Sequence, residues 1–392
     1  MPVLSLGRLP LVNVLVEPGE QDVERFPLDV VRCRRCTLVQ ITETVAPERL
    51  FRTYSYFSSF SETYVEHARR LAAWAIGEFA LGRGSSVVEA ASNDGYLLQF
   101  FQEHGLDVLG IEPARNVAEF ARSRGIETLS EFLDVELAGR IVEERGAADL
   151  VIANNVVAHV PDLHGFVEAL AKLAGPAGHV VLEVPYLRQL VDAVEFDTIY
   201  HEHLCYFSLT SLRPVLEAHG LTLRRVERLD VHGGSLRIHG AATGAVDPSV
   251  GRLIAEESAW GVGDAKRFED FAAAVDTLRR DVHRLVTQLV ESGARVAAYG
   301  AAAKGVVLAN VCKLDAELVD FVVDRNPHKQ GKFLPGVGIP VRPPGALRAA
   351  QPDYCLLFAW NLTDEIAEQQ AAYLAAGGRF IAPLPTPHVL AA

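Results

Sequence analysis

The segment "SSVVEAASNDGYLLQFF", residues 85–101, decides the fold of this chain. It begins with apolar residues typical of a buried strand and continues through a turn of small residues around Gly95 into a second apolar run. A buried strand that passes through such a turn into a helix is the opening unit of a parallel α/β sheet. The segment therefore predicts an α/β fold with a ligand site at this turn.

The alternation of strand and helix continues beyond this segment. Short apolar runs typical of strands alternate with runs whose apolar residues are three and four positions apart, as in amphipathic helices. The predicted strands are 107–113, 148–156 and 179–186, and the predicted helices are 63–82, 94–105, 114–125 and 164–178. This order predicts a doubly wound parallel sheet.

The rest of the chain divides around this sheet. Residues 208–243 predict a helix and antiparallel strands, and residues 264–293 predict one long amphipathic helix. The alternation then restarts and predicts a second, nucleotide-binding-like α/β domain. The N-terminal residues form a small irregular module with one close cysteine pair. We therefore expect three domains, at residues 1–58, 59–245 and 246–392.

The composition is typical of a globular protein. The 392 residues are 49% hydrophobic and 22% charged, with a formal net charge of −13. Such an acidic surface argues against sequence-independent nucleic-acid binding, which needs lysine and arginine. No apolar run reaches the ~20 residues that span a bilayer, no signal peptide is recognisable, and five cysteines do not make a disulfide framework. We expect a cytoplasmic protein.

Acidic residues near the first turn indicate its ligand. Glu89 and Asp94 flank the turn, and Glu112 ends the second strand, where a carboxylate can accept both hydroxyl groups of a ribose. The dinucleotide fingerprint G-x-G-x-x-G is absent. An acidic turn that cradles no phosphate favours S-adenosylmethionine, a cationic nucleoside, over a dinucleotide. The alternative is a purely structural unit with acidic strand ends.

The stretch "YHEH" at residues 200–203 concentrates groups that can move a proton. Histidine titrates near neutral pH, so His203 is a candidate group for moving a proton. Glu202 beside it can orient the ring. The two histidines are two residues apart, which does not match the H-E-x-x-H metalloprotease pattern. The alternative is a set of hydrogen-bonded residues near a strand end.

A second turn of small residues, "YGAAAKG" at residues 299–305, follows a predicted strand and opens a helix. Its backbone N–H groups and Lys304 suit a diphosphate. Two alternatives stay open. One is a nicotinamide dinucleotide site with Asp324 as the ribose ligand, and the other is tight packing of the helix against the strand.

Further segments occur in an order known from one enzyme family. They include "PLDVVRCRRCTLVQ", "GIEPARNVAEFARSRGIET", "ANNVVAHVPDL", "YHEHLCYFSLTSL", "HGGSLRIH" and "FLPGVGIPV". Together with the two turns they resemble the three-domain sugar C-methyltransferases, which act on nucleotide-linked 4-keto deoxysugars in antibiotic biosynthesis. The resemblance covers almost the full chain. It implies a zinc-binding N-terminal domain, a central Rossmann-like domain that binds S-adenosylmethionine, and a C-terminal Rossmann-like domain that holds the nucleotide sugar.

The resemblance also implies roles for individual residues. The catalytic set is Tyr54, His159, Tyr200, Glu202 and His203. The resemblance implies that His203 is the general base that removes the proton next to the ketone. Glu202 would orient the ring of His203 or bind a sugar hydroxyl, and the tyrosines and His159 would stabilise the oxyanion. The set that binds S-adenosylmethionine adds to Glu89 the residues Ala91, Ser92, Asn93, Asp94, Gly95, Glu112, Pro113, Asn154 and Asn155. The set that binds the nucleotide sugar is Tyr56, Tyr186, His232, Gly233, Gly234, Ser235, Arg237, Tyr299 and Lys304.

One departure from the family concerns the metal. The family has two Cys-x-x-Cys pairs, the first shortly before a segment that matches "LGRLPLVN" at residues 6–13. No cysteine precedes that segment here, and Cys33 and Cys36 form a lone pair, whereas a structural zinc site takes four ligands. We expect either a start assigned too late or the loss of zinc. The two cysteines are then a zinc ligand pair or a buried thiol pair.

The expected activity is S-adenosylmethionine-dependent C-methylation of a 4-keto deoxysugar linked to a nucleotide such as dTDP. Two alternatives stay open: a nicotinamide-dependent oxidoreductase of a nucleotide sugar, and a non-catalytic relative that binds sugar nucleotides. The missing dinucleotide fingerprint argues against the first, and the intact "YHEH" argues against the second. We expect a monomer or homodimer that binds neither nucleic acid nor membrane.

Overall fold

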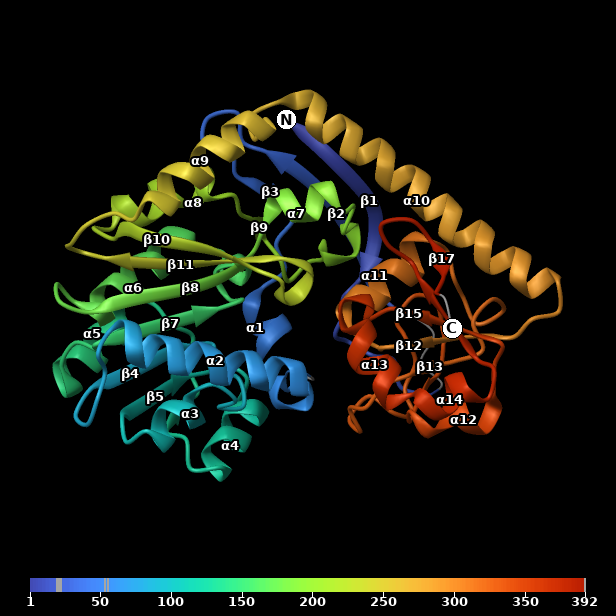
Figure 1. Cartoon of the computed structure of the whole chain (residues 1–392), viewed down its shortest axis with the longest axis horizontal. Coiled ribbons are helices and arrows are strands. Elements are labelled where there is room, and N and C mark those ends of the chain that lie inside the picture. The colour runs from blue at the N-terminus through green and yellow to red at the C-terminus, as the bar shows by residue number, and fades with distance from the viewer. Residues whose placement is uncertain (19–22, 53, 55, 391–392) are drawn as a thin grey trace.

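The chain folds around three sheets, which lie side by side with helices packed around them (Figure 1). This arrangement is seen in a computed structural model that describes residues 1–18, 23–52, 54 and 56–390. Within these residues the first sheet along the chain has four strands, the second has seven and the third has six. The predicted α/β fold with two parallel sheets is confirmed.

The first sheet is antiparallel, with the strand order β1-β2-β3-β9. Its strands are β1 (Pro2–Pro10), β2 (Arg25–Arg32), β3 (Val39–Ile41) and β9 (Cys205–Tyr206), and the short helix α1 (Pro47–Phe51) follows it. The N-terminal module is therefore more regular than the sequence predicts, because buried and partly exposed residues alternate along β2. Since β9 directly follows residues 200–203, the first sheet anchors the "YHEH" segment.

The second sheet has the strand order β10-β11-β8-β7-β4-β5-β6. Its strands are β4 (Ser86–Ala90), β5 (Asp107–Ile111), β6 (Thr128–Leu129), β7 (Leu150–Asn154), β8 (His179–Pro185), β10 (Thr222–Leu229) and β11 (Ser235–Ala241). Five neighbouring strands, β8, β7, β4, β5 and β6, run parallel. At the other end of the sheet β11 and β10 are antiparallel to their neighbours, as predicted. The chain order reverses between β4 and β7, and ligands of such sheets bind at this point, beyond the carboxyl ends of the strands.

Helices cover both faces of the second sheet (Figure 1). They are α2 (Glu62–Glu78), α3 (Leu98–Glu103), α4 (Arg115–Ser123), α5 (Val135–Arg145), α6 (Leu163–Ala174) and α8 (Leu209–Ala218). The sequence predicts all of these except α5. Asp134, which begins α5, accepts a hydrogen bond from the backbone N–H of Leu137 and is a typical N-cap.

The third sheet has the strand order β14-β13-β12-β15-β16-β17 and is parallel except for β17. Its strands are β12 (Val296–Tyr299), β13 (Val322–Val323), β14 (Val341–Arg342), β15 (Tyr354–Leu357), β16 (Arg379–Ala382) and β17 (His388–Val389). Its helices are α11 (Ala303–Val311), α12 (Gly345–Ala350), α13 (Thr363–Gln369) and α14 (Ala371–Ala375). This is the predicted second α/β domain.

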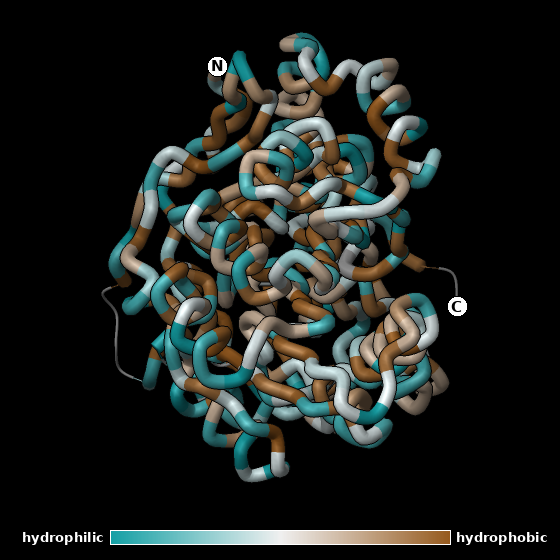
Figure 2. The backbone as a smooth tube through the Cα atoms, turned by 90° about the vertical axis from the view of Figure 1, so that its left-hand side faces the viewer, coloured by the Kyte–Doolittle hydropathy of each residue, from teal (hydrophilic) through white to brown (hydrophobic). Residues whose placement is uncertain are grey.

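The helices α7 (Leu187–Asp192), α9 (Pro248–Trp260) and α10 (Ala265–Glu291) join the three sheets. The tube alternates between hydrophobic and hydrophilic residues along surface helices, as amphipathic helices require (Figure 2). One face of α10 packs into a core shared with the first and third sheets; its buried residues are Phe268, Phe271, Val275, Leu278, Val282 and Val286. No helix among the described residues combines the length and apolarity that a membrane crossing needs.

Candidate active site

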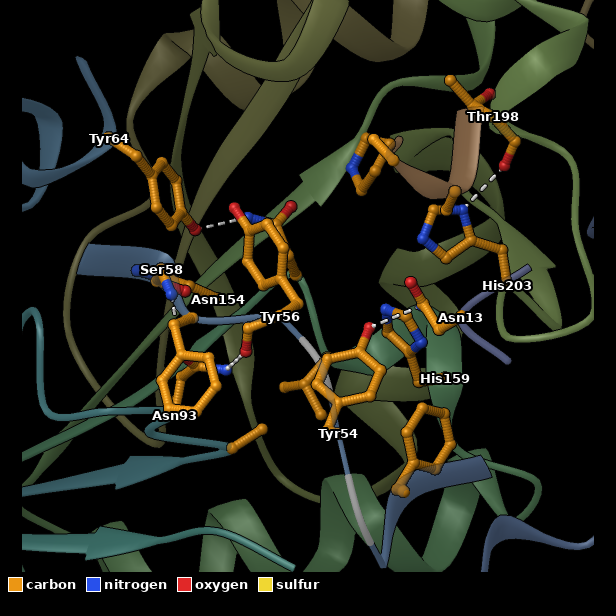
Figure 3. A pocket seen from close by; sticks show the side chains of 18 of the residues that line it. Asn13, Tyr54, Tyr56, Ser58, Tyr64, Asn93, Asn154, His159, Thr198 and His203 are labelled. Carbon is orange, nitrogen blue, oxygen red and sulfur yellow. Dashed lines mark hydrogen bonds between the residues drawn. The ribbon is translucent and has the colours of Figure 1, made fainter. Parts of the chain in front are cut away.

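A cavity of ≈970 Å³ is lined by residues in or next to strands of all three sheets, and part of its wall is drawn in Figure 3. Its wall includes Asn13 beyond β1, residues beyond the carboxyl ends of β4, β5 and β7, and the start of α11. The volume is within the range of ~300–1,000 Å³ typical of small-molecule sites. The cavity also lies at the reversal of strand order in the second sheet, where such folds bind ligands.

The predicted residues divide into those that line this cavity and those that do not. On its wall lie Tyr54, Tyr56, Ala91, Asn93, Glu112, Pro113, Asn154, Asn155, His159, Tyr186, Tyr200, His203, Gly234, Tyr299 and Lys304. Away from its wall lie Glu89, Ser92, Asp94, Gly95, Glu202, Gly233, Ser235 and Arg237. The side chain of His232 lies outside the described part of the structure. No ligand contact tests these roles, so they stay predictions.

Glu112 is held at the first turn by backbone donors. Its Oε2 accepts a hydrogen bond from Asn93 N at 2.9 Å, and its Oε1 accepts one from Ala114 N at 2.8 Å. Asn93 can aim its N–H in this direction because its φ is 50°, in the left-handed region that asparagine tolerates. Burial raises the pKa of Glu112 to about 7, and the two backbone donors oppose that rise. A carboxylate fixed in this way still has lone pairs for ribose hydroxyls.

Two asparagines at the carboxyl end of β7 complete a surface that fits S-adenosylmethionine. The Oδ1 atoms of Asn154 and Asn155 are buried and have no hydrogen-bond partner among the described residues. Asn155 Nδ2 donates to Tyr64 at 2.9 Å, so its Oδ1 is the end left over. Unpaired acceptors beside a carboxylate require a ligand rich in N–H and O–H groups. The amino and ribose groups of S-adenosylmethionine meet this requirement.

Other predicted residues of the first turn support it from within. Gly95 has a φ of 77°, and a Cβ atom there would lie 2.9 Å from a neighbouring side chain. Asp94 Oδ2 accepts a hydrogen bond from Ser59 N at 3.2 Å. Glu89 is 1% exposed, and its burial raises its pKa well above the usual range. Ser92 is likewise buried, so these side chains shape the turn rather than its cavity face.

The hydrogen bonds of His203 fix its tautomer. The carbonyl oxygen of Thr198 can only accept, so His203 Nδ1, 2.8 Å away, carries the proton and donates it. In a neutral ring the lone pair is then on Nε2, which accepts a hydrogen bond from the Tyr200 hydroxyl at 2.9 Å. His203 therefore presents a basic nitrogen at the cavity wall, paired with a tyrosine that also lies there.

Glu202 lies behind the wall, where two wall residues donate to it. Tyr54 donates its hydroxyl to Glu202 Oε2 at 3.0 Å, and Asn13 Nδ2 lies 2.8 and 2.9 Å from the two carboxylate oxygens. Burial raises the pKa of Glu202 to about 7, although both donors oppose that rise. Asn13 is a site residue that sequence reasoning missed. It is the last residue of "LGRLPLVN", a segment that the sequence analysis used only to locate the missing cysteines.

His159 and His203 lie side by side on the cavity wall, with their ring centroids 4.7 Å apart. Burial lowers the pKa of His159 to about 4, so its ring is neutral at physiological pH. Its Nδ1 is buried and has no hydrogen-bond partner among the described residues. A neutral ring of this kind can donate an N–H to an oxyanion but does not bring a positive charge.

Lys304 lies at the start of α11, between the cavity and two buried carboxylates. Burial lowers its pKa, and the nearby charges of Asp197 and Glu195 oppose that effect. Its Nζ lies 4.4 Å from the centroid of the Trp360 ring, a cation–π contact. Trp360 in turn donates its Nε1 hydrogen to Asp197 at 2.6 Å. These contacts hold Lys304 in the first turn of α11, whose N-terminus lies on the cavity wall.

Arg237, predicted to bind the sugar nucleotide, is engaged inside the second sheet. It forms an ion pair with Glu183 at 2.7 Å, on the neighbouring strand β8. Glu183 also lies 2.8 Å from His67 Nε2 and is fully buried. Ser235 is similarly occupied, because its hydroxyl donates to the carbonyl of Val231 at 3.1 Å. Of this predicted segment, Gly234 reaches the cavity wall.

The cysteine pair does not provide a closed zinc site. Cys33 and Cys36 are free thiols, and Cys36 is exposed. Across the described residues there is no group of three or more histidine, cysteine, aspartate or glutamate side chains that could hold a metal ion. The donors present therefore do not fit a structural zinc ion, which takes four ligands.

Comparison with known families divides the chain into three matched regions. Residues 230–385 match the family described as "C-methyltransferase C-terminal domain", residues 64–226 match "Methyltransferase domain", and residues 1–51 match a domain described as zinc binding. The C-methyltransferase NovU of Streptomyces niveus is 39% identical over 397 residues, which cover 100% of this chain and 94% of NovU. The Bordetella avium ubiquinone biosynthesis O-methyltransferase is 31% identical over 100 residues, covering 25% of this chain and 42% of that enzyme.

Solved structures also resemble part of the chain. The magnesium protoporphyrin IX methyltransferase of Synechocystis with bound SAH is 16% identical, covers 46% of this chain and 84% of its own, and has a TM-score of 0.38. The PH0226 protein of Pyrococcus horikoshii is 15% identical, covers 50% of this chain and 98% of its own, and also has a TM-score of 0.38. Scores this low carry no inference about function.

Proposed function

This chain belongs to the C-methyltransferase family, and we propose that its substrate is a nucleotide-linked 4-keto deoxysugar that it methylates on a carbon atom next to the ketone. Family membership argues against an oxidoreductase, and the intact "YHEH" segment argues against a non-catalytic relative. The methyl donor of this enzyme is S-adenosylmethionine, which when bound supplies an electrophilic methyl group. Glu112, Asn154 and Asn155 are the residues that would hold it.

The observation that carries the proposal is the arrangement of His203. A carbon atom attached to a ketone becomes nucleophilic only after it loses a proton, so the reaction needs a base in the cavity. His203 Nε2 is such a base, because the Thr198 carbonyl holds the proton of the ring on Nδ1. A base of this kind would serve transfer to a hydroxyl oxygen as well, so the carbon acceptor is supported by membership of the C-methyltransferase family.

In the proposed reaction Tyr200 and His203 act in sequence. Tyr200 donates its hydroxyl hydrogen to His203 Nε2, which therefore has no lone pair for a substrate until that bond is broken. The ketone oxygen of the sugar takes over the tyrosine hydrogen bond, and Nε2 becomes available. The carbon–hydrogen bond next to the ketone then breaks, its proton moves to Nε2, and its electron pair forms the enolate.

The developing negative charge on the ketone oxygen is stabilised by fixed donors. Tyr200 is one of them, and the neutral ring of His159 is a second because its ring lies 4.7 Å from that of His203. Tyr54 already donates its hydrogen to Glu202, so we assign it to orienting the sugar rather than to the oxyanion. The diphosphate would lie toward Lys304 and the N-terminus of α11.

Methyl-labelled S-adenosylmethionine and a panel of dTDP-linked 4-keto deoxysugars test the substrate. We expect the label in a methyl group bonded to carbon, which NMR of the product distinguishes from a methyl group on oxygen. Transfer to oxygen, or absence of transfer by a protein that binds S-adenosylhomocysteine normally, would contradict the proposal.

A further inference from the structure

Asn13 brings a carboxamide from the first sheet to the cavity wall. It follows β1, and the two residues before it, Leu11 and Val12, are 6% and 3% exposed. Three residues later, Val16 pairs with Phe333 of the C-terminal domain through backbone hydrogen bonds of 3.0 and 2.9 Å. The backbone is held on both sides of Asn13, so the Cα atom from which the Asn13 side chain reaches the cavity wall has a fixed position.

Glu202 determines which way this carboxamide faces. Asn13 Nδ2 lies 2.8 Å from Glu202 Oε1 and 2.9 Å from Oε2. Above its pKa of about 7 the Glu202 carboxylate only accepts hydrogen bonds, so the amino end of the amide has to face it. Turning the amide over would place its carbonyl oxygen against two carboxylate oxygens. Figure 3 shows the Asn13 side chain beside Tyr54, which donates to the same carboxylate at 3.0 Å.

The other end of the amide is therefore an acceptor that the protein leaves unused. Asn13 lines the cavity, whereas Glu202 is 2% exposed and lies behind it. Within the described part of the chain no hydrogen bond reaches Asn13 Oδ1. An acceptor with a locked orientation on a cavity wall selects a ligand that offers a hydrogen-bond donor at that point.

We propose that Asn13 binds the sugar directly, with its Oδ1 accepting a hydrogen bond from a ring hydroxyl group, and that Glu202 is the positioning residue that keeps the amide in this orientation. The inference rests on the proposed nucleotide-sugar substrate. It gives the first sheet a part in substrate selection, because a sugar without a hydroxyl group at this position leaves the acceptor unpaired. It also assigns buried Glu202 a role that does not require contact with the sugar.

Calorimetry tests the contact without relying on turnover. The probes are a dTDP-linked 4-keto-6-deoxyhexose and analogues that each lack one ring hydroxyl, titrated into protein saturated with S-adenosylhomocysteine. We expect Asn13→Ala to weaken binding of the parent sugar nucleotide by about five- to tenfold, the usual loss for one neutral hydrogen bond. One analogue should bind the wild type and Asn13→Ala equally, because neither complex can form the bond.

Glu202→Gln tests whether Glu202 fixes the orientation of the Asn13 amide. Glutamine can donate as well as accept, so it permits both orientations of the Asn13 amide, and we expect a loss of a few-fold in sugar binding. In an Asn13→Ala background the same substitution should add little, because the orientation no longer matters. Gln40→Ala, an exposed amide residue of the same sheet, is the matched control and should bind like the wild type.

Two results would overturn the inference. One is unchanged binding of the parent sugar nucleotide by Asn13→Ala, or by Asn13→Ser if the alanine variant does not fold. The other is an equal loss with every analogue, which would show that Asn13 acts only on the structure. If the wild type binds no sugar nucleotide of the panel, the proposed function fails as well, and that outcome is distinct from a failure of the variants alone.

Discussion

The two turns that open onto the cavity, after β4 and after β12, occupy corresponding places in their sheets, and the charged side chains beside them have opposite sign. Each follows a parallel strand, consists of small residues and leads into a helix. Beside the first turn lies the carboxylate of Glu112, held by two backbone N–H groups. Beside the second lies Lys304, over the ring of Trp360 and between the cavity and the carboxylates of Glu195 and Asp197. The charged side chains beside the two turns therefore distinguish them.

This difference indicates how one cavity can take two nucleoside ligands without confusing them. A carboxylate and unpaired amide oxygens favour a cationic nucleoside with free ribose hydroxyls. A lysine at a helix N-terminus favours an anion. The comparison also separates binding from chemistry, since the histidines His159 and His203 lie on the methyltransferase side. Each prediction below changes one side of this comparison.

His203→Asn should have the largest effect, because it removes the only base that we assign. We expect turnover to fall by ~10²–10⁴-fold, the range for a lost general base. Binding of S-adenosylhomocysteine and of the sugar nucleotide should stay close to that of the wild type in calorimetry. Tyr200→Phe and His159→Asn should lose less, because each leaves the other donor to the oxyanion. His104→Asn, an exposed histidine at the end of α3, serves as the control.

Glu112→Ala should weaken ligand binding at the first turn and leave binding at the second turn unchanged. We expect binding of S-adenosylhomocysteine to weaken by about tenfold or more, since hydrogen bonds to a charged group contribute ~1.5–3 kcal/mol. Binding of the sugar nucleotide should not change, and isothermal titration with each ligand measures both. Glu119→Ala on the exposed face of α4 makes the same change in charge. Unchanged affinity in Glu112→Ala would remove this carboxylate from the site.

Lys304→Met should produce the converse pattern with a smaller effect. We expect the sugar nucleotide to bind about three- to tenfold more weakly, because the helix N-terminus still attracts the diphosphate. Affinity for S-adenosylhomocysteine should stay the same. Lys313→Met removes a lysine just beyond the other end of α11 and is the matched control. A loss of S-adenosylhomocysteine affinity would show that the two turns are not independent.

Zinc should have no effect on either turn. The described residues offer no group of three or more side chains for a metal ion, so we expect purified protein to carry less than one zinc ion per chain. A chelator should leave the unfolding temperature unchanged, because only a bound ligand stabilises by mass action. Elemental analysis that finds one zinc ion per chain would refute this.

Sequence reasoning predicted the first turn better than the residues around it. The strand ending in Glu112 places its carboxylate at the sheet edge, and the structure puts it on the cavity wall. The acidic turn assigned Glu89 to the cofactor, and the resemblance assigned Arg237 to the sugar nucleotide; both roles stay predictions. Neither residue lies on the cavity wall: Glu89 is buried inside a strand, and Arg237 forms an ion pair across strands with Glu183. Which face a strand residue presents depends on packing that strand position alone does not reveal.

Asn13 could not be predicted because its partner is 189 residues away in the chain. No local pattern connects an asparagine after β1 with a glutamate between β8 and β9. The link exists because β9 pairs with β3 and so brings residues 200–203 against the first sheet. Long-range strand pairing of this kind is a property of the folded chain, whereas helix periodicity and turn composition are local.

Exchange of solvent deuterium into the sugar tests the central claim most directly. In heavy water, with S-adenosylhomocysteine in place of the methyl donor, the wild type should exchange the proton next to the ketone of a dTDP-linked 4-keto-6-deoxyhexose. NMR follows this exchange, which reports enolate formation apart from methyl transfer. The account predicts no enzyme-dependent exchange by His203→Asn, although both ligands still bind. Exchange by His203→Asn at the wild-type rate would contradict the account and move the base elsewhere, with His159 the next candidate.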